Sequence, residues 1–139
     1  MRPQAVLETI IYCPDLAAGE AFYRDVVGLV ALTRMPPRHV FFRCGEGMLL
    51  MFNPDVTSAE RVEVGGSAIP LHGGRGPGHV AFRVPAAELP GWRKRLASLG
   101  VPIESEIRWP QGGESIYVRD PAGNSVEFVT AAVWGLGEW

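Results

Sequence analysis

Residues 120–128, DPAGNSVEF, combine a turn with the beginning of a strand, and this combination decides the fold. The proline, glycine and asparagine are typical turn residues, and the apolar side chains of Val126 and Phe128 alternate with polar neighbours. The preceding segment 114–120, ESIYVRD, alternates in the same way. Together the two segments predict a β-hairpin with one apolar and one polar face.

Upstream of this hairpin the sequence predicts a strand and a helix. Residues 79–84, HVAFRV, follow a Gly-Pro-Gly sequence and have the composition of a strand. Residues 86–100, AAELPGWRKRLASLG, predict a helix that ends at Gly100. The second half of the chain is therefore a strand, a helix and at least one hairpin.

The first half repeats this order. A strand is predicted over 6–13, a helix over 16–27 with Gly28 as its stop, and two strands over 40–44 and 48–52. The spacing between the halves is the same to within one residue, because Glu8 precedes His79 by 71 positions and Gly28 precedes Gly100 by 72. The sequence therefore predicts two copies of one structural unit.

The predicted fold class is α+β, with two tandem βαβββ modules that form curved mixed sheets around a cavity. The whole chain, 1–139, is expected to be a single domain. Its predicted parts are module 1 at about 5–53, a linker at 54–77, module 2 at about 78–131 and a C-terminal tail at 132–139. The linker is assigned from its many glycines and prolines. Trp134 and Trp139 in the tail are expected to cover a sheet face or a subunit contact.

Composition excludes several classes of partner. Thirteen basic and fifteen acidic residues give a net charge of −2, with no basic cluster, so neither nucleic acid nor a membrane is an expected partner. The sequence has no apolar run of transmembrane length and no apolar signal-peptide core, which predicts a soluble, cytoplasmic protein. Cys13 and Cys44 lie far apart and do not predict a disulfide framework or a thiolate zinc site.

The alternation of side chains along a strand places three ionisable side chains on the sheet face that is not expected to meet the helix. In each of the three strands one phase is almost wholly apolar and is expected to meet the helix. Glu8, His79 and Glu127 belong to the other phase. In the strand 48–52 both phases are apolar, and Leu50 occupies the corresponding position.

These positions identify a resemblance. The first strand followed by DLAAGEAFYRDVVGL, the strand GHVAF, and DPAGNSVEF after a hairpin strand together resemble the vicinal-oxygen-chelate superfamily over roughly residues 5–131. This superfamily includes glyoxalase I, extradiol dioxygenases, fosfomycin-resistance transferases and bleomycin-resistance binding proteins. FYRDVVGL and DPAGNSVEF are specific for its architecture more than for any one activity.

The resemblance implies a metal site formed by Glu8, His79 and Glu127, with Leu50 at the fourth position. Metal-dependent members usually have histidine, or in glyoxalase I histidine or glutamine, where this chain has Glu8. One imidazole and two carboxylates suit Fe²⁺, Mn²⁺, Ni²⁺, Co²⁺ or Zn²⁺. Two glutamates without a cation would repel each other in an apolar cavity. The alternative is a metal-free pocket in which Glu8 pairs with Arg83 or Arg119.

Further residues are predicted to line the site. Glu8 and Glu127 are the candidate catalytic bases, and His72 is either an additional site residue or a loop histidine. The predicted substrate-binding side chains, each of which has a purely structural alternative, are Tyr12, Phe42, Leu50, Trp109, Ser115, Tyr117 and Arg119.

Two functions of different classes follow. The first is a metal-dependent enzyme, glyoxalase-like (a lyase or isomerase) or dioxygenase-like (an oxidoreductase), acting on a small organic substrate with vicinal oxygens. The second is a metal-free protein of the bleomycin-resistance type that sequesters a small molecule. The resemblance also implies a homodimer, in which the site is formed within one chain or shared between two.

Overall fold

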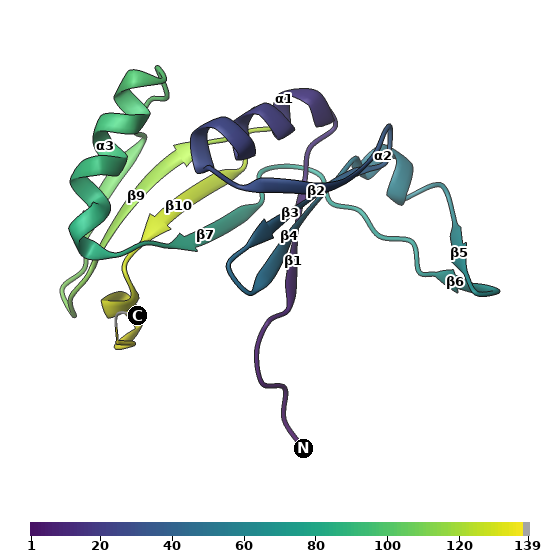
Figure 1. The fold of residues 1–139 in the computed structure, drawn as a ribbon, viewed down its shortest axis with the longest axis horizontal. Coiled ribbons are helices and arrows are strands. Elements are labelled where there is room, and N and C mark those ends of the chain that lie inside the picture. The colour runs from purple at the N-terminus through teal and green to yellow at the C-terminus, as the bar shows by residue number, and fades with distance from the viewer. Residues whose placement is uncertain (138–139) are drawn as a thin grey trace. The chain divides into compact units, whose positions relative to one another are not determined.

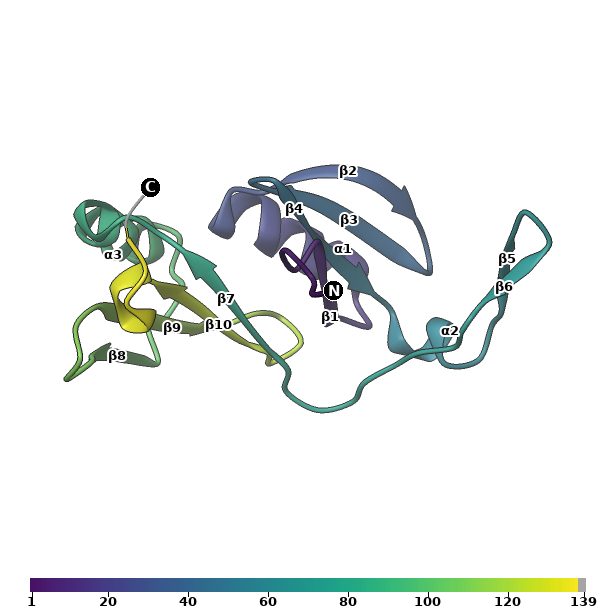
Figure 2. The same cartoon turned by 90° about the horizontal axis from the view of Figure 1, so that it is seen from below.

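The computed structural model describes residues 1–137 and divides into two compact units, residues 1–78 and 79–139 (Figures 1 and 2). Trp139 and the end of the predicted tail lie outside the described residues. Each unit contains a four-stranded mixed sheet with a helix on one face. The predicted α+β fold with two βαβββ modules is therefore confirmed.

The sheet of the first unit has the strand order β1-β4-β3-β2, in which only β1 and β4 are parallel. Its elements are β1 (Glu8–Tyr12), α1 (Leu16–Ala21), η1 (Phe22–Val27), β2 (Val30–Met35), β3 (His39–Cys44) and β4 (Gly47–Phe52). They are followed by α2 (Pro54–Thr57), β5 (Val62–Val64) and β6 (Ser67–Ile69).

The first helix begins and ends where the sequence predicts. The Asp15 side chain accepts a hydrogen bond from the backbone N–H of Ala18 at 3.0 Å and so caps the helix. The helix continues as the π-helical segment η1 and stops at Gly28, whose φ of 89° is readily adopted by glycine alone. Tyr23 is buried and lies with its ring 5.7 Å from that of Phe42 in β3. The apolar face of this helix therefore packs on β3.

The second unit repeats the arrangement with the order β7-β10-β9-β8, in which only β7 and β10 are parallel. Its elements are β7 (His79–Arg83), η2 (Ala86–Glu88), α3 (Leu89–Ser98), β8 (Ser105–Arg108), β9 (Glu114–Arg119), β10 (Ser125–Val129) and η3 (Ala131–Trp134). The Trp92 ring of α3 stacks on Phe128 at 4.2 Å. This contact identifies the helix-covered face and confirms the predicted strand phase, because Glu127 lies on the opposite face.

The strand registers make Leu50 the counterpart of Glu127. Glu127 pairs with Ala81, two residues after His79. Leu50 pairs with Ile10, which is likewise two residues after Glu8. The same comparison aligns Phe41, opposite Leu50, with Tyr117, opposite Glu127. The first unit therefore carries an apolar pair where the second unit carries a carboxylate and a phenol.

The structure adds elements that the sequence analysis did not identify. β2 and β8 are edge strands whose side chains are mostly exposed, so neither shows a clear apolar phase. The region 54–77, predicted as linker, contains α2 and a hairpin, β5–β6, which extends away from the β1–β4 sheet in both views (Figures 1 and 2). The Gly65-Gly66 pair at its tip, with φ of 59° and 80°, is a hairpin signal that the sequence does contain.

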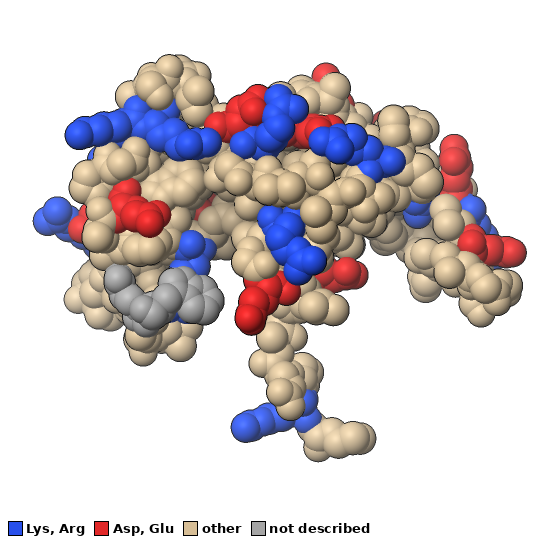
Figure 3. Space-filling view, in the orientation of Figure 1, with Lys and Arg blue, Asp and Glu red and all other residues tan. Residues whose placement is uncertain are grey.

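Within residues 1–137, no helix combines the length and apolar character needed to cross a membrane. On the face shown in Figure 3, basic and acidic side chains are interspersed.

Candidate functional site

His79 and Glu127 meet on the uncovered face of the second sheet. His79 opens β7, and its Nε2 lies 3.2 Å from Oε2 of Glu127 in the neighbouring strand β10. The His79 side chain is 52% exposed, whereas that of Glu127 is only 9% exposed. The pair therefore combines a buried carboxylate with an imidazole that a ligand can reach from solvent.

The hydrogen bonds of His79 show that this pair suits a cation. Its Nδ1 lies 3.2 Å from the backbone oxygen of Ser125, which can only accept, so Nδ1 carries the proton. In the neutral imidazole Nε2 is then an acceptor that faces a carboxylate oxygen, also an acceptor. Such a pair needs a proton or a metal ion between its atoms, and a carbonyl behind a ligating imidazole is the usual support in metal sites. The residues present therefore fit a divalent metal.

Glu127 is held from its other side by a tyrosine. The Tyr117 hydroxyl donates to Glu127 Oε1 at 2.8 Å. Burial raises the pKa of Tyr117, as does the hydrogen bond to Glu127, whereas a hydrogen bond with Ser115 lowers it. Ser115 is almost fully buried, and its Oγ accepts a hydrogen bond from Trp109 Nε1 at 2.8 Å. Of the residues predicted to bind substrate, Trp109 thus bonds Ser115, and Tyr117 bonds Glu127.

Arg119, also predicted to bind substrate, is engaged by a neighbouring carboxylate. Its Nη2 donates to Glu104 Oε1 at 2.8 Å, its Nε donates to Oε2, and Nη1 bonds the Gly123 carbonyl at 3.2 Å. The bond from Arg119 lowers the pKa of Glu104. The guanidinium of Arg83 donates to the Gly137 carbonyl.

The first unit presents Glu8 at the start of β1. Glu8 is exposed, and its carboxylate has no hydrogen bond or ion pair within residues 1–137. Leu50 is buried in β4. Phe42 has no exposed surface because it packs under the helix against Tyr23, which is incompatible with its expected place in a substrate wall. The half-buried Phe41 occupies the uncovered face instead, since it pairs with Leu50.

Tyr12 contacts His72, a partner that sequence analysis did not assign to it. The two side chains are joined by a 2.9 Å hydrogen bond between Tyr12 Oη and His72 Nδ1, and the His72 ring lies 4.7 Å from that of Phe52. A Cβ at Gly74 would come within 2.9 Å of the Tyr12 ring, so glycine allows this segment to lie directly on β1. Tyr12 therefore anchors the segment that follows β6.

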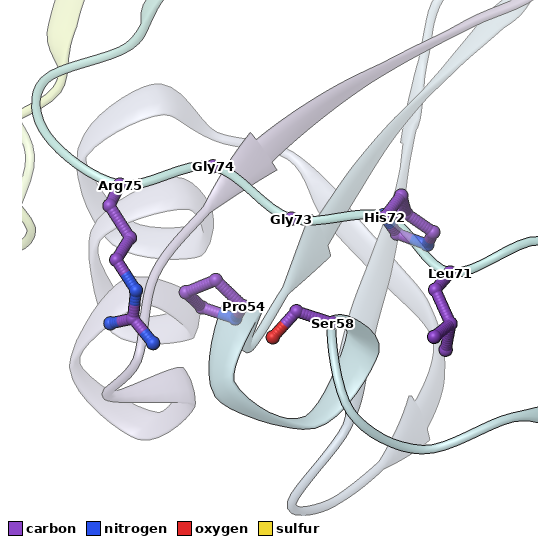
Figure 4. A pocket seen from close by; sticks show the side chains of 7 residues that line it. All are labelled: Pro54, Ser58, Leu71, His72, Gly73, Gly74 and Arg75. Carbon is purple, nitrogen blue, oxygen red and sulfur yellow. The ribbon is translucent and has the colours of Figure 1, made fainter.

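The same segment borders an open depression of about 480 Å³, shown in Figure 4. Pro54 and Ser58 from the region of α2 form one side, and residues 71–75 form the other. The guanidinium of Arg75 donates to Asp55 at 2.6 Å. This ion pair offsets the charge of the one cationic side chain among the residues that line the depression.

Beside Phe52 lies a buried histidine with an unsatisfied nitrogen. His39 is 8% exposed, its ring stacks on Phe41 at 3.9 Å, and its Nδ1 has no hydrogen-bond partner within residues 1–137. Burial, and secondarily the charge of Arg38, lower the pKa of His39. This imidazole is therefore held in its neutral form.

We expect His39 to make the protein less stable in mild acid. In the unfolded chain the His39 imidazole has a pKa of about 6.5, which is above its pKa in the folded protein. The free energy of unfolding therefore decreases as the pH falls below about 6.5. Urea unfolding between pH 8 and pH 5 should show a smaller decrease for His39→Leu than for the wild type. Parallel pH profiles of the two proteins would contradict this assignment.

Neither unit alone, within residues 1–78 and 79–137, brings together three or more His, Cys, Asp or Glu side chains that could hold a metal ion. The second unit supplies the pair His79 and Glu127, and the first unit supplies Glu8.

Comparison with known proteins identifies the family to which the chain belongs. The Glyoxalase/Bleomycin resistance protein/Dioxygenase superfamily matches residues 5–128. The metallothiol transferase FosB of Bacillus licheniformis is 29% identical over 121 residues, which is 86% of this chain and 71% of that protein. The crystal structure of lactoylglutathione lyase from Agrobacterium tumefaciens has a TM-score of 0.90 and 44% identity, with 98% of this chain and 100% of that chain covered.

The fosfomycin resistance protein FosX of Mesorhizobium loti, with a TM-score of 0.61 and 21% identity over 94% of both chains, shares the fold. The match to the family extends from before β1 to the penultimate residue of β10 and includes both units. The chain therefore belongs to the glyoxalase/bleomycin resistance protein/dioxygenase superfamily.

Proposed function

We propose that this protein is a divalent-metal-dependent enzyme that acts on a small organic substrate with vicinal oxygens. His79 and Glu127 are two of the proposed metal ligands, and Glu8 is the third. The observation that carries the proposal is the 3.2 Å approach of His79 Nε2 and Glu127 Oε2, with Nδ1 of the same imidazole facing a carbonyl. The metal is one of Fe²⁺, Mn²⁺, Ni²⁺, Co²⁺ and Zn²⁺.

The relatives support a glyoxalase-like chemistry. The protein from A. tumefaciens, named as a lactoylglutathione lyase, shares 44% of its residues with this chain. FosB is named as a metallothiol transferase. We therefore propose lyase or isomerase chemistry ahead of oxidative cleavage by a dioxygenase.

The proposed roles of the two glutamates differ. When bound, the metal supplies Lewis-acid stabilisation of negative charge that develops on a substrate oxygen. Tyr117 and His79 already contact the two oxygens of Glu127, so this carboxylate is suited to binding the metal in a fixed orientation. Glu8 has no such partners within residues 1–137, and its carboxylate is the better candidate to accept a proton from the substrate.

Apolar side chains on the uncovered face of the first sheet would contact the carbon skeleton of the substrate. Leu50 and Phe41 are paired across β4 and β3, and Phe52 lies two residues after Leu50 on the same face. These side chains favour a substrate with an apolar portion beside its oxygens. We propose them, in place of Phe42, as the apolar wall.

The same apolar wall supports the alternative of a metal-free protein that sequesters an apolar compound.

We further propose a homodimer, because apolar Val6 and Leu7 next to β1 are 82% and 71% exposed.

Metal analysis tests the proposed function. Protein purified without chelator should contain stoichiometric divalent metal and should turn over lactoylglutathione in either direction. Glu8→Ala and His79→Ala should each lose the metal, because each removes one of three ligands. Glu63→Ala, which removes an exposed carboxylate from β5, is the matched control and should retain the metal.

Two results would contradict the proposed metal-dependent enzyme. A wild-type protein that neither contains nor takes up Zn²⁺, Mn²⁺, Co²⁺, Ni²⁺ or Fe²⁺, yet binds an apolar dye, would support the sequestering protein. Metal retained by His79→Ala at wild-type affinity would exclude the proposed ligand set.

A further inference from the structure

Arg38, in the turn that precedes β3, carries a buried positive charge without an ion pair. The residue is 8% exposed, and its guanidinium contacts no carboxylate within residues 1–137. Its one side-chain hydrogen bond in this range, from Nη1 to the Glu60 carbonyl, is long at 3.4 Å. A buried cation is costly unless an anion lies beside it. This guanidinium therefore has both the charge and the donors to bind an anion.

Aromatic rings without negative charge surround the guanidinium. It lies over the Phe52 ring, 6.0 Å from the ring centroid. His39 and His72 contact the same ring at centroid distances of 5.7 and 4.7 Å. Burial, and secondarily the charge of Arg38, lower the pKa of both histidines, so both imidazoles are neutral at neutral pH. The charge of Arg38 is therefore the dominant charge among these side chains.

Two donors of Arg38 are accessible to a ligand. Among residues 1–137, the fully buried side-chain nitrogen or oxygen without a partner is Nδ1 of His39. Nε and Nη2 of Arg38 also have no partner there, so each retains some surface in contact with solvent. The same edge of Arg119 donates to both oxygens of Glu104. The free edge of Arg38 therefore has the geometry that binds a carboxylate.

An apolar path leads from Arg38 toward Glu8 on the uncovered face of the first sheet. The half-buried Phe41 ring lies 5.1 Å from the ring of Phe52. Ile10, two residues after Glu8 on the same face, is 39% exposed. Phe52 pairs with the residue four positions after Glu8, which is about 13 Å along the strand. The buried cation and the proposed metal ligand therefore lie at opposite ends of one apolar surface.

We propose that this face binds an organic carboxylate, with its carboxylate group on the Nε–Nη2 edge of Arg38 and its carbon chain on the apolar wall. The inference deepens the proposed function and rests on it in one respect, namely that this ligand is the substrate. The substrate then carries a carboxylate at the end remote from its vicinal oxygens. Arg38 is the residue that selects this charged end.

Calorimetric titration with hexanoate tests the site independently of activity. Hexanoate should bind the wild type more tightly than hexanol does, because only hexanoate offers a carboxylate to Arg38. Arg38→Met should weaken hexanoate binding by about 10- to 100-fold, as expected for hydrogen bonds to a charged group. Arg61→Met removes an exposed cation next to Glu60 and is the matched control, which should retain the wild-type affinity.

Urea denaturation separates a binding role of Arg38 from a structural one. Without hexanoate, Arg38→Met should be at least as stable as the wild type, because an apolar side chain replaces a buried charge that has no ion pair. A loss of stability together with unchanged hexanoate affinity would assign Arg38 to the fold and overturn the proposal. If Arg38→Met does not fold, Arg38→Lys provides the affinity measurement. It should bind hexanoate more weakly than the wild type, because lysine lacks the two-donor edge.

Turnover tests whether the ligand is the substrate. The lactoyl thioester of mercaptohexanoate should have a KM about 10- to 100-fold lower than that of mercaptohexanol. Arg38→Met should remove this difference without changing kcat, because the carboxylate lies far from the reacting atoms. Equal KM values in a wild type that turns over both thioesters would overturn the proposal. A protein that binds hexanoate through Arg38 but contains no metal and turns over neither thioester would retain the carboxylate site and reject the proposed function.

Discussion

Replacing Glu127 by glutamine is expected to abolish metal binding at physiological concentrations. The amide can still accept the hydrogen bond from Tyr117, so the local packing is retained while the negative charge is lost. The affinity for Zn²⁺ should fall by more than about 100-fold, beyond the effect of removing a supporting residue. Competition titration with a chromophoric chelator measures this change.

The matched control for this variant is Glu114→Gln. Glu114 lies on β9 of the same sheet, where it pairs with Arg93 of α3 at 3.2 Å and therefore faces the helix. Its replacement removes the same charge without touching the uncovered face, and Zn²⁺ affinity should remain at the wild-type value. Equal affinities of Glu127→Gln and the wild type would remove Glu127 from the ligand set.

The largest loss of stability is expected for Phe128→Ala. Phe128 has no exposed surface, and its ring stacks on Trp92 at 4.2 Å. Truncation leaves a cavity between β10 and α3, which costs about 3–5 kcal/mol of the free energy of unfolding. This is a large fraction of the roughly 5–15 kcal/mol that stabilises a typical domain. Urea denaturation, analysed by its midpoint at constant slope, measures the effect.

Trp134→Ala provides a comparison of similar size. Trp134 is 78% exposed in η3, so its truncation should change the free energy of unfolding by no more than about 0.5 kcal/mol. A loss for Phe128→Ala as small as that for Trp134→Ala would show that the contact between α3 and β10 does not stabilise the second unit.

The repeat and the faces of its strands could be predicted from local sequence. The spacing of Gly28 and Gly100 gives the repeat length because both residues end helices with a positive φ. Val126 and Phe128 alternate with Ser125 and Glu127 because one phase of β10 packs against α3, where Phe128 stacks on Trp92, and the other phase lies on the face that the helix does not cover. β2 and β8 were not identified because exposed edge strands have no buried phase to mark them.

The first-unit site residues could be predicted only in part. Phe41 and Phe42 are chemically identical neighbours, and both are compatible with a strand. Pairing with Leu50 places Phe41 on the uncovered face, and contact with Tyr23 places Phe42 under the helix. A shift of one residue exchanges the two faces, so the register decides between them.

The sequence by itself determined the two βαβββ modules and placed His79 and Glu127 on uncovered sheet faces, because helix stops and strand alternation are local properties of the chain. Only the tertiary structure decided which partners the polar side chains take. Trp109 bonds Ser115, Tyr117 bonds Glu127, and Arg119 bonds Glu104. These partners come from neighbouring strands and loops, and a hydrogen bond forms only when packing brings donor and acceptor to within about 3 Å.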